Sequence, residues 1–592
     1  MTAYTAPLRE IEFLLHDVLR IAEQDIPGYA ALDRDITAQI HAEAARLAET
    51  VLAPLNASGD AEGCRRDGAT VTTPAGFTDA FRRLAEGGWI SLDCAEPHGG
   101  QGMPYLLNCT TGEMFVAANM ALNMYQGLTH AAISALQAHA APELQDRYLP
   151  PLVAGRWAGT MNLTEAHCGT DLGLIRTRAE PQPDGSYRIT GQKTWISGGE
   201  HDLTENIVHL VLARITGAPE GTRGLSLFVV PKRMPEAGGQ PGAANGVTCT
   251  GLERKMGIHA AATCSMAYDG ATGWLVGAEN AGLKAMFTMM NEARLGVGLQ
   301  GFAVASRAHQ AAVAFARDRL QGRALDGPRN PDGPADPILV HPDVRRALMD
   351  QRAFVQGARA LVFWVATLID RGHRLPDPAA ADMAALLTPV VKGFLTDKGF
   401  EACVSAQQVA GGAGYVHGTG FEQFTRDARI AMIYEGTNGV QALDLVARKL
   451  SMKGGKPMLT FFDLIRAETR NGTADPALAE GFVAPLKEAA RDLQSATGVF
   501  MERGLKHPAE ALSGAHDFLR LMGHVCLGLM WTRMARAAAQ ALAEGRGDPA
   551  FHRATLTTGR HYMRWALPET AVHLSRIRSG AETVMELAEE AF

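Results

Sequence analysis

Several kinds of sequence feature are missing from this chain of 592 residues, and each absence excludes a class of protein. No two of the eight cysteines form a CxxC pair, which excludes a zinc ribbon and a dithiol redox motif. The net charge is -7, so the chain has no excess of basic residues that would indicate binding to nucleic acid or to an anionic membrane. Scattered thiols are typical of a reducing compartment, so we expect a cytoplasmic protein.

Long apolar segments and targeting signals are also missing. The first residues, "MTAYTAPLREIEFLLHDVL", carry Arg9, Glu10, Glu12 and Asp17 and lack a basic start followed by an apolar core, so we expect no secretory signal. The run "ALVFWVATLI" (360–369) is too short to cross a bilayer. We therefore expect a buried helix there and no membrane insertion.

Hydrophobic periodicity divides the chain into helical, strand-rich and again helical regions. Short segments rich in β-branched and aromatic residues predict strands at 186–197, 206–215 and 224–231. Residues 231–246 are a loop by composition, and 282–320 could form one long helix. The expected domains are an N-terminal extension (1–35), a helical domain (36–160), a β domain (161–278), a helical bundle (279–452) and a C-terminal helical domain (460–592).

The fold class that follows is mainly α with a central all-β domain, plus extra helices at the C-terminal end. A chain of this length is too long for one core. The β domain is expected to be a small barrel or a sandwich. Residues 1 to about 160 are expected to be helical throughout.

Glu435 stands at the end of the apolar run "AMIY" and is followed by Gly436 and Thr437. A helical pattern then begins, with Thr437 or Asn438 as its cap. One interpretation is an acid stabilised at a helix N-terminus by the helix dipole. The other is a catalytic base in a dry pocket, where burial raises the pKa of the carboxyl group towards the working range. These residues alone leave both interpretations open.

Three further segments combine glycines with polar side chains. "QQVAGGAGYVHGTGF" (407–421) is either a flexible turn or a loop whose amides meet a phosphate. "MNLTEAHCGTD" (161–171) offers hydroxyl groups, but by itself it is an ordinary polar loop. In "GQKTWISGG" (191–199), Trp195 is either a core residue or a flat wall against an aromatic cofactor. No spacing typical of metal ligands stands out, and we expect no metal.

Taken in order, these segments resemble the flavin-dependent acyl-CoA dehydrogenase family over about residues 36–450. "LTEAHCGTD", "GQKTWISGG", "QQVAGGAGY" and "IYEGTNGVQ" look like four characteristic segments of that family. The resemblance implies a helical domain, a β-barrel and a four-helix bundle. It also implies FAD as cofactor and an acyl-CoA thioester as substrate.

The resemblance assigns roles to individual residues. Glu435 would remove the α-proton of the thioester while the β-hydrogen leaves as hydride to the flavin, which supplies the redox chemistry. The implied FAD contacts are Leu163, Thr164, Thr170, Trp195, Ser197 and Thr437, with Arg319, Gln408 and Gly412 reaching a neighbouring subunit's FAD. The implied substrate contacts are Thr170, Arg294, Glu435 and Gly436.

The chain departs from the family pattern at several positions. Ala166 stands where proline is usual, and "RDRLQGR" (317–323) lacks a usual phenylalanine, which weakens the expected contact with a neighbouring subunit. Some members place the base immediately before an arginine that matches Arg294. That neighbour here is Ala293, and Glu292 would face elsewhere on a helix, so Glu435 is our choice.

The first residues and the helical tail resemble a longer subgroup, which includes dehydrogenases of 3-(methylthio)propanoyl-CoA in dimethylsulfoniopropionate breakdown. The product would be 3-(methylthio)acryloyl-CoA. The alternatives are a straight-chain fatty acyl-CoA dehydrogenase, an acyl-CoA oxidase and, in another class, a DNA-binding flavoprotein. We expect an electron-transferring flavoprotein as acceptor, a homodimer or dimer of dimers, and no nucleic acid partner.

Overall fold

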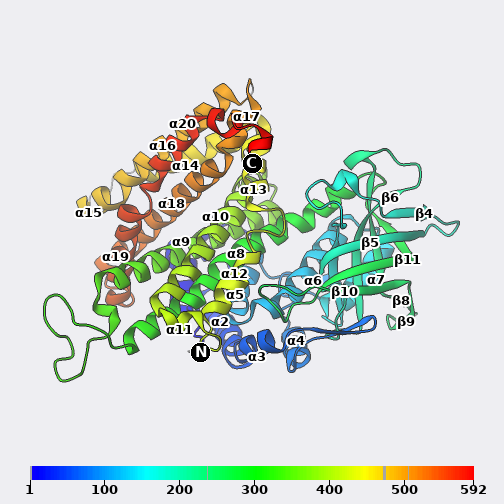
Figure 1. The fold of residues 1–592 in the computed structure, drawn as a ribbon, viewed down its shortest axis with the longest axis horizontal. Coiled ribbons are helices and arrows are strands. Elements are labelled where there is room, and N and C mark those ends of the chain that lie inside the picture. Colours follow the sequence, from blue (N-terminus) through cyan, green and yellow to red (C-terminus); the bar gives the residue numbers. More distant parts are fainter. Residues whose placement is uncertain (1–2, 237, 471–474, 505) are drawn as a thin grey trace. The chain divides into compact units, whose positions relative to one another are not determined.

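The computed structural model describes residues 3–236, 238–470, 475–504 and 506–592 (Figure 1). The chain forms two compact units, which are described separately. Unit 1 comprises Met1–Ala45, Cys109–Ala117 and Val297–Phe592. Unit 2 comprises Arg46–Asn108 and Ala118–Gly296.

Unit 2 contains a seven-stranded sheet that closes on itself. Its strands are β3 (Trp157–Asn162), β4 (Arg178–Pro181), β5 (Tyr187–Ser197), β6 (Asn206–Ile215), β7 (Leu225–Pro231), β10 (Val247–Leu252) and β11 (Thr263–Val276). Strand β11 pairs with β5, β5 with β4, β4 with β6, β6 with β7, and β7 again with β11. The five strands therefore form a closed ring, a barrel, with β3 and β10 added to it. A closed ring leaves fewer open edges for aggregation than a sandwich does.

Helices α6 (Met120–His139) and α7 (Pro142–Val153) provide the main helical packing of the barrel. Their apolar side chains share one buried cluster with β3, β6, β7 and the start of α8, in which Leu149, Trp157 and Leu210 are fully buried. The run "NIVHLVLARI" of β6 is buried at nine of its ten positions, which explains why it lacks an alternating pattern.

Two sequence predictions are wrong in detail for unit 2. The region before residue 160 also holds a hairpin, β1 (Arg65–Asp67) with β2 (Thr70–Thr72), beside helices α3 (Pro54–Glu62) and α4 (Phe77–Glu86). The loop expected at 231–246 contains a second hairpin, β8 (Arg233–Pro235) with β9 (Pro241–Ala244). Such short strands carry too few residues for a period of two to show in the sequence.

Long helices form the centre of unit 1. They are the part of α8 (Gly282–Asp318) from Val297, α9 (Pro342–Arg374) and α10 (Pro378–Ala410), with the shorter α12 (Phe421–Ile430) and α13 (Asn438–Asp444). The single long helix predicted over 282–320 is confirmed. Its glycines allow close packing, because a Cβ on Gly298 would lie 2.8 Å from the Val391 carbonyl oxygen of α10.

Gly301→Ala is expected to lower the free energy of unfolding by about 1–3 kcal/mol, because the new Cβ would meet the backbone of α10. A Cβ at this position would lie only 2.7 Å from the carbonyl oxygen of Leu395. Urea titration measures the change. Gly296→Ala, on the same helix with nothing within 4 Å, is the matched control and should gain about 0.5–1 kcal/mol of stability. Equal effects of the two variants would contradict close packing at Gly301.

The C-terminal helices belong to the same compact unit as the bundle. They are α14 (Lys456–Arg470), α16 (Ala484–Arg503), α17 (Pro508–Ser513), α18 (Ala515–Ala543), α19 (Pro549–Trp565) and α20 (Glu569–Ser579). Figure 1 shows α18 running alongside α16, α19 and α20. Trp531 of α18 is fully buried and donates from its indole nitrogen to the Ala353 carbonyl of α9 at 3.1 Å.

The N-terminal segment is tied into unit 1 by charge. Arg359 of α9 is 1% exposed and donates through Nε to Glu113 of α5 (Tyr105–Ala118) at 2.9 Å, and through Nη1 to Glu10 of α1 (Leu8–Phe13). Arg9 pairs with Asp548 just before α19 at 2.7 Å. The buried guanidinium of Arg359 therefore contacts two segments, α1 and α5, that are each more than 200 residues away in sequence.

Among the residues that the structure describes, two helices, α9 and α10, are long and apolar enough to cross a membrane, with a mean hydropathy of 1.3 in their most apolar windows. These windows are 89% and 72% buried inside the protein, which is typical of the core helices of a soluble protein. The run 360–369 lies in α9, and residues such as Leu361 and Val365 are fully buried. The prediction of a buried helix there is confirmed.

Candidate functional site

Glu435 lies in the turn between α12 and α13 of unit 1. Its φ is +57°, and that of the following Gly436 is +79°. The left-handed region costs a residue with a side chain about 1–3 kcal/mol, and it persists only where the surrounding structure enforces it. Strain of this kind gathers at functional sites. The side chain of Glu435 is partly exposed.

The first residues of α13 anchor the Glu435 turn to α10. Thr437 caps α13 as predicted, accepting from the Val440 amide at 3.3 Å. Asn438 is buried, accepts from Lys392 Nζ at 2.8 Å and donates to Asp397 at 2.6 Å. These bonds hold the Glu435 turn against the bundle.

Asn438→Ala is expected to lower the free energy of unfolding by about 1–3 kcal/mol, because the buried Lys392 and Asp397 lose this partner. We also expect kcat to fall, since the Glu435 turn loses its fastening to α10. Urea titration and steady-state turnover measure the two effects. Asn123→Ala removes an amide that makes no side-chain hydrogen bond in the described part of the chain, and it should change neither value.

Two segments singled out in the sequence lie side by side in unit 2. The loop 163–171 follows β3, and 191–197 is the second half of β5. The Thr194 amide donates to the Thr164 carbonyl at 2.9 Å, and the Thr160 hydroxyl donates to the Ser197 carbonyl at 2.7 Å. The structure therefore brings Leu163, Thr164 and the strand carrying Trp195 and Ser197 to one edge of the barrel.

A buried ion pair joins these two segments. Lys193 Nζ, with a fully buried side chain, donates to Glu165 at 2.9 Å and to the Leu163 carbonyl at 2.8 Å. Glu165 also accepts from the Thr177 hydroxyl at 2.6 Å and from the Arg176 amide at 2.8 Å. Burial lowers the pKa of Lys193 to about 8. Burial alone would raise the pKa of Glu165, but Lys193 and these donors lower it. At pH 7 both groups are charged.

Trp195 is turned outwards by a local irregularity of β5. The register between β5 and β11 shifts next to it, between the pairs of Cys264 and Met266. Its φ is +61°, and 61% of its surface is exposed. Trp195 and Glu435 are two of six non-glycine residues with positive φ in the described part of the chain. A β-bulge re-aims a side chain in this way.

The edge of the barrel fits a flavin by its chemistry. The hydroxyls of Thr164, Thr170 and Ser197 have no side-chain partner in the described part of the chain, and all three residues are at least partly exposed. An exposed indole offers a flat apolar face to a ring system. Hydroxyls without partners offer donors and acceptors to a polar cofactor. These residues could hold a flavin.

The remaining predicted residues are placed as follows. Arg319 comes directly after α8, is exposed and stacks over Phe315 at 5.4 Å. Gln408 is exposed in the last turn of α10, and Gly412 begins the short α11 (Gly412–Tyr415) with open space around it. Arg294 is 8% exposed in the part of α8 that belongs to unit 2.

Glu292, the alternative acid on α8, is engaged elsewhere. It faces His130 Nδ1 of α6, whose Nε2 lies 2.6 Å from Asp93. Burial opposes the charged ring, but the two carboxylates hold the pKa of His130 well above its ordinary value. The imidazolium therefore ties α8, α6 and the loop after α4 together, which makes Glu292 a poor candidate for a base.

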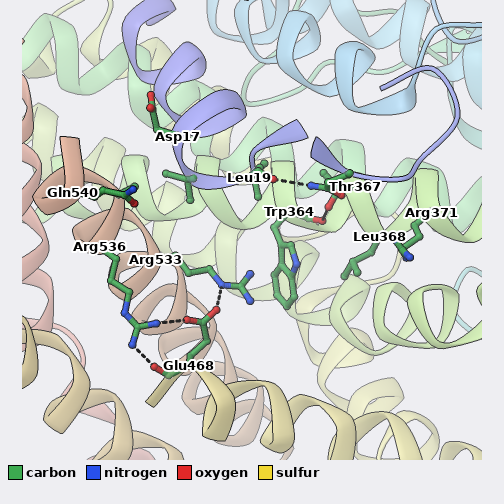
Figure 2. A pocket seen from close by; sticks show the side chains of 13 residues that line it. Asp17, Leu19, Trp364, Thr367, Leu368, Arg371, Glu468, Arg533, Arg536 and Gln540 are labelled. Carbon is green, nitrogen blue, oxygen red and sulfur yellow. Dashed lines mark hydrogen bonds and ion pairs between the residues drawn. The ribbon is translucent and has the colours of Figure 1, made fainter. Parts of the chain in front are cut away.

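A pocket of about 380 Å³ lies in unit 1 (Figure 2). None of the predicted site residues lines it. Arg533 and Arg536 converge on Glu468 at 2.7 and 2.6 Å, and Arg533 stacks over Trp364 at 5.1 Å. Glu468 thus partly neutralises both guanidinium groups, and Arg371, which also lines the pocket, pairs with Asp25 and Asp377.

Family models match most of the chain. The N-terminal, middle and C-terminal domains of acyl-CoA dehydrogenase match residues 35–156, 160–271 and 280–450. A model described as acetyl-CoA dehydrogenase C-terminal like matches 461–588. The chain belongs to the acyl-CoA dehydrogenase family. The resemblance found in the sequence and the predicted fold class are thereby confirmed.

Relatives of this acyl-CoA dehydrogenase align over almost its whole length. It is 39% identical to 3-methylmercaptopropionyl-CoA dehydrogenase of Ruegeria pomeroyi, covering 98% of this chain and 99% of the relative. It is 33% identical to the broad-specificity linear acyl-CoA dehydrogenase FadE5 of Mycobacterium tuberculosis, covering both chains fully. ACDH-11 of Caenorhabditis elegans, solved with C11-CoA, has the same fold, with a TM-score of 0.80, 18% identity and coverage of 100% and 97%.

Sequence reasoning missed three sets of polar contacts around the candidate residues of this acyl-CoA dehydrogenase. They are the Lys193–Glu165 pair, the Asn438 anchor and the His130 clamp. The sequence did hold a signal for Lys193. In a strand, alternate side chains point to the same face, so Lys193 lies on the buried face of β5 with Tyr187 and Ile189, where a charged group needs a partner. His130 is an ionisable group in the mainly buried helix α6, but its partners Asp93 and Glu292 are remote in sequence.

Proposed function

We propose that this acyl-CoA dehydrogenase introduces an α,β double bond into 3-(methylthio)propanoyl-CoA, with Glu435 as the base. The observation that carries the proposal is the strained, anchored turn that presents Glu435 (φ +57°). The identity to 3-methylmercaptopropionyl-CoA dehydrogenase, 39% over the full length, supports the thioether substrate. The alternative is a straight-chain acyl-CoA, which the relative with broad linear specificity favours.

In this proposal a carboxylate oxygen of Glu435 takes the α-proton, and the backbone N–H of Glu435 donates to the thioester oxygen. That hydrogen bond stabilises the developing negative charge and makes the α-proton acidic enough for a carboxylate. Gly436 leaves room for the thioester to approach the backbone. Arg294 and Thr170 contact the substrate. FAD, when bound, supplies the acceptor for the β-hydride.

We assign FAD binding to Leu163, Thr164, Thr170, Trp195, Ser197 and Thr437. Trp195 provides the flat face, and the hydroxyl groups provide the polar contacts. Exposure of Arg319, Gln408 and Gly412 supports their contact with a neighbouring subunit's FAD, and hence a homodimer or a dimer of dimers. Light scattering of the FAD-loaded protein tests this assembly, and a monomer that retains FAD would contradict it.

The decisive experiment is a steady-state comparison of 3-(methylthio)propanoyl-CoA with butyryl-, octanoyl- and palmitoyl-CoA. We expect the highest kcat/KM with the thioether substrate. A higher kcat/KM with octanoyl- or palmitoyl-CoA would contradict the thioether substrate and support the straight-chain alternative. Equal turnover with oxygen and with an electron-transferring flavoprotein would indicate an oxidase instead of a cytoplasmic dehydrogenase that passes electrons to that flavoprotein.

A further inference from the structure

Two histidines and one glutamate converge between α18 and α20 in unit 1. One nitrogen of His524, one of His573 and one carboxylate oxygen of Glu569 lie within 4.8 Å of one another. His524 Nε2 is 3.1 Å from Glu569 Oε2. The histidines are 1% and 3% exposed, while the glutamate side chain, 43% exposed, reaches the surface.

The His573 ring has one satisfied nitrogen and one that is not. Its Nδ1 lies 2.7 Å from a carboxylate oxygen of Asp517 on α18. An ionised carboxylate only accepts hydrogen bonds, so Nδ1 carries a proton. Its Nε2 is buried and has no hydrogen-bond partner in the described part of the chain. A buried imidazole nitrogen without a partner is a costly arrangement that calls for a ligand.

The His524 ring has a partner at each of its nitrogens. Its Nδ1 lies 3.1 Å from the Tyr562 hydroxyl, which itself donates to the His524 carbonyl at 3.3 Å. Since a carboxylate only accepts, Nε2 carries the ring proton and donates to Glu569, and a bound metal ion would replace that proton. Two ligands on one tetrahedral ion with bonds of about 2.0–2.2 Å lie about 3.3–3.6 Å apart. The 3.1 Å between His524 Nε2 and Glu569 Oε2 is close to that spacing.

We propose that His524, Glu569 and His573 bind one divalent ion of the zinc class, which links α18 to α20. Two imidazoles and one carboxylate are a ligand set that Zn²⁺ and Co²⁺ accept, with water completing a tetrahedron. Asp517 and Tyr562 contact the outer ring nitrogens and orient both rings, as supporting groups do in metal sites. Glu569 and His573 lie four positions apart on α20, but such a pair alone does not indicate a metal, and His524 is 45 positions before Glu569.

Lys398 of α10 is the competing cation. Its Nζ is 3.2 Å from Glu569 Oε2 and 3.0 Å from Glu401. When the metal binds, Lys398 retains Glu401 as its partner and releases Glu569. Arg576, 3.4 Å from Asp517, balances the second carboxylate.

Two other clusters in the described chain bring potential ligand atoms equally close, but they are already occupied. In one, both ring nitrogens of His130 face carboxylates. In the other, Glu165 is paired with Lys193. Only the cluster between α18 and α20 contains a ring nitrogen that is buried without a partner.

The test uses the FAD-loaded protein, freed of metal with EDTA and dialysed, then titrated with Co²⁺. We expect one Co²⁺ per chain by elemental analysis, with visible bands of tetrahedral Co²⁺ at wavelengths beyond the flavin absorption. His573→Gln should weaken binding by about 10- to 100-fold. His561→Gln is the matched control, because His561 on α19 pairs with Asp350 outside the cluster and should leave binding unchanged.

A second variant keeps the test valid if His573→Gln fails to fold. Glu569→Gln changes a partly exposed side chain and should also weaken Co²⁺ binding while thermal unfolding stays cooperative. Lys398→Ala should tighten binding, since the competing cation is gone. Absence of Co²⁺ binding to the unaltered protein, or binding that His573→Gln and Glu569→Gln leave unchanged, would overturn the proposal. Turnover is not the readout, so failure here leaves the proposed function standing.

Discussion

Glu435→Gln is expected to lower kcat by about 10²- to 10⁴-fold while the protein keeps its FAD. The amide has nearly the shape of the carboxylate, so the anchored turn can form, but it does not accept the α-proton. Because the loss lies in the chemical step, substrate binding should survive. Steady-state turnover measures kcat, and the change of the flavin spectrum on adding acyl-CoA measures binding.

The control for this variant removes a nearby negative charge without touching the turn. Asp444→Asn lies on α13, where the carboxylate pairs with Arg448 at 3.5 Å one turn further along the chain. Its kcat should stay within about twofold, because the Asp444–Arg448 pair lies outside the Glu435 turn. Near-normal turnover of Glu435→Gln would show that another residue is the base. An equal loss of kcat in Asp444→Asn would show that the effect comes from the loss of a negative charge near the site and not from Glu435 itself.

Lys193→Met is expected to lower the free energy of unfolding by about 3–5 kcal/mol at pH 7, because it leaves the buried Glu165 carboxylate without its cation. Methionine preserves most of the apolar stem, so the loss reports on the charge and its two hydrogen bonds. We also expect weaker FAD binding, since the Thr164 loop loses its tie to the strand of Trp195. Urea titration and flavin retention after dialysis measure the two effects.

A double variant separates the ion pair from general damage to the barrel. Lys193→Met combined with Glu165→Gln removes both charges, and it should recover part of the lost stability because no buried charge stays unpaired. The double-mutant cycle gives the coupling energy directly. A double variant as unstable as the sum of the single ones would show that the two residues do not act as a pair.

Much of the architecture could be predicted from local patterns. The strands 186–197, 206–215 and 224–231 correspond to β5, β6 and β7, and the helix 282–320 to α8. These elements are long and apolar enough for their period to show. The hairpins β1–β2 and β8–β9 were not predicted, because strands of three or four residues are too short to show an alternating hydrophobic pattern.

The residues next to the proposed chemistry were also visible in the sequence, but their support was not. Glu435 before Gly436 and Thr437 is a local motif. The Asn438–Lys392 contact joins positions 46 apart, and the Lys193–Glu165 pair joins positions 28 apart. No pattern in the sequence says which of many distant polar residues will meet.

By itself, the sequence determined the longer helices and strands and the family, and it singled out Glu435 as a candidate, since periodicity and short motifs depend on neighbouring residues. Only the tertiary structure decided which charges are buried and with whom they pair. Lys193 with Glu165, His130 between two carboxylates, and His524 beside Glu569 and His573 all depend on chain segments that meet in space. The physical reason is that burial withdraws water from an ionisable group, and only a partner brought close by packing then decides its protonation and its role.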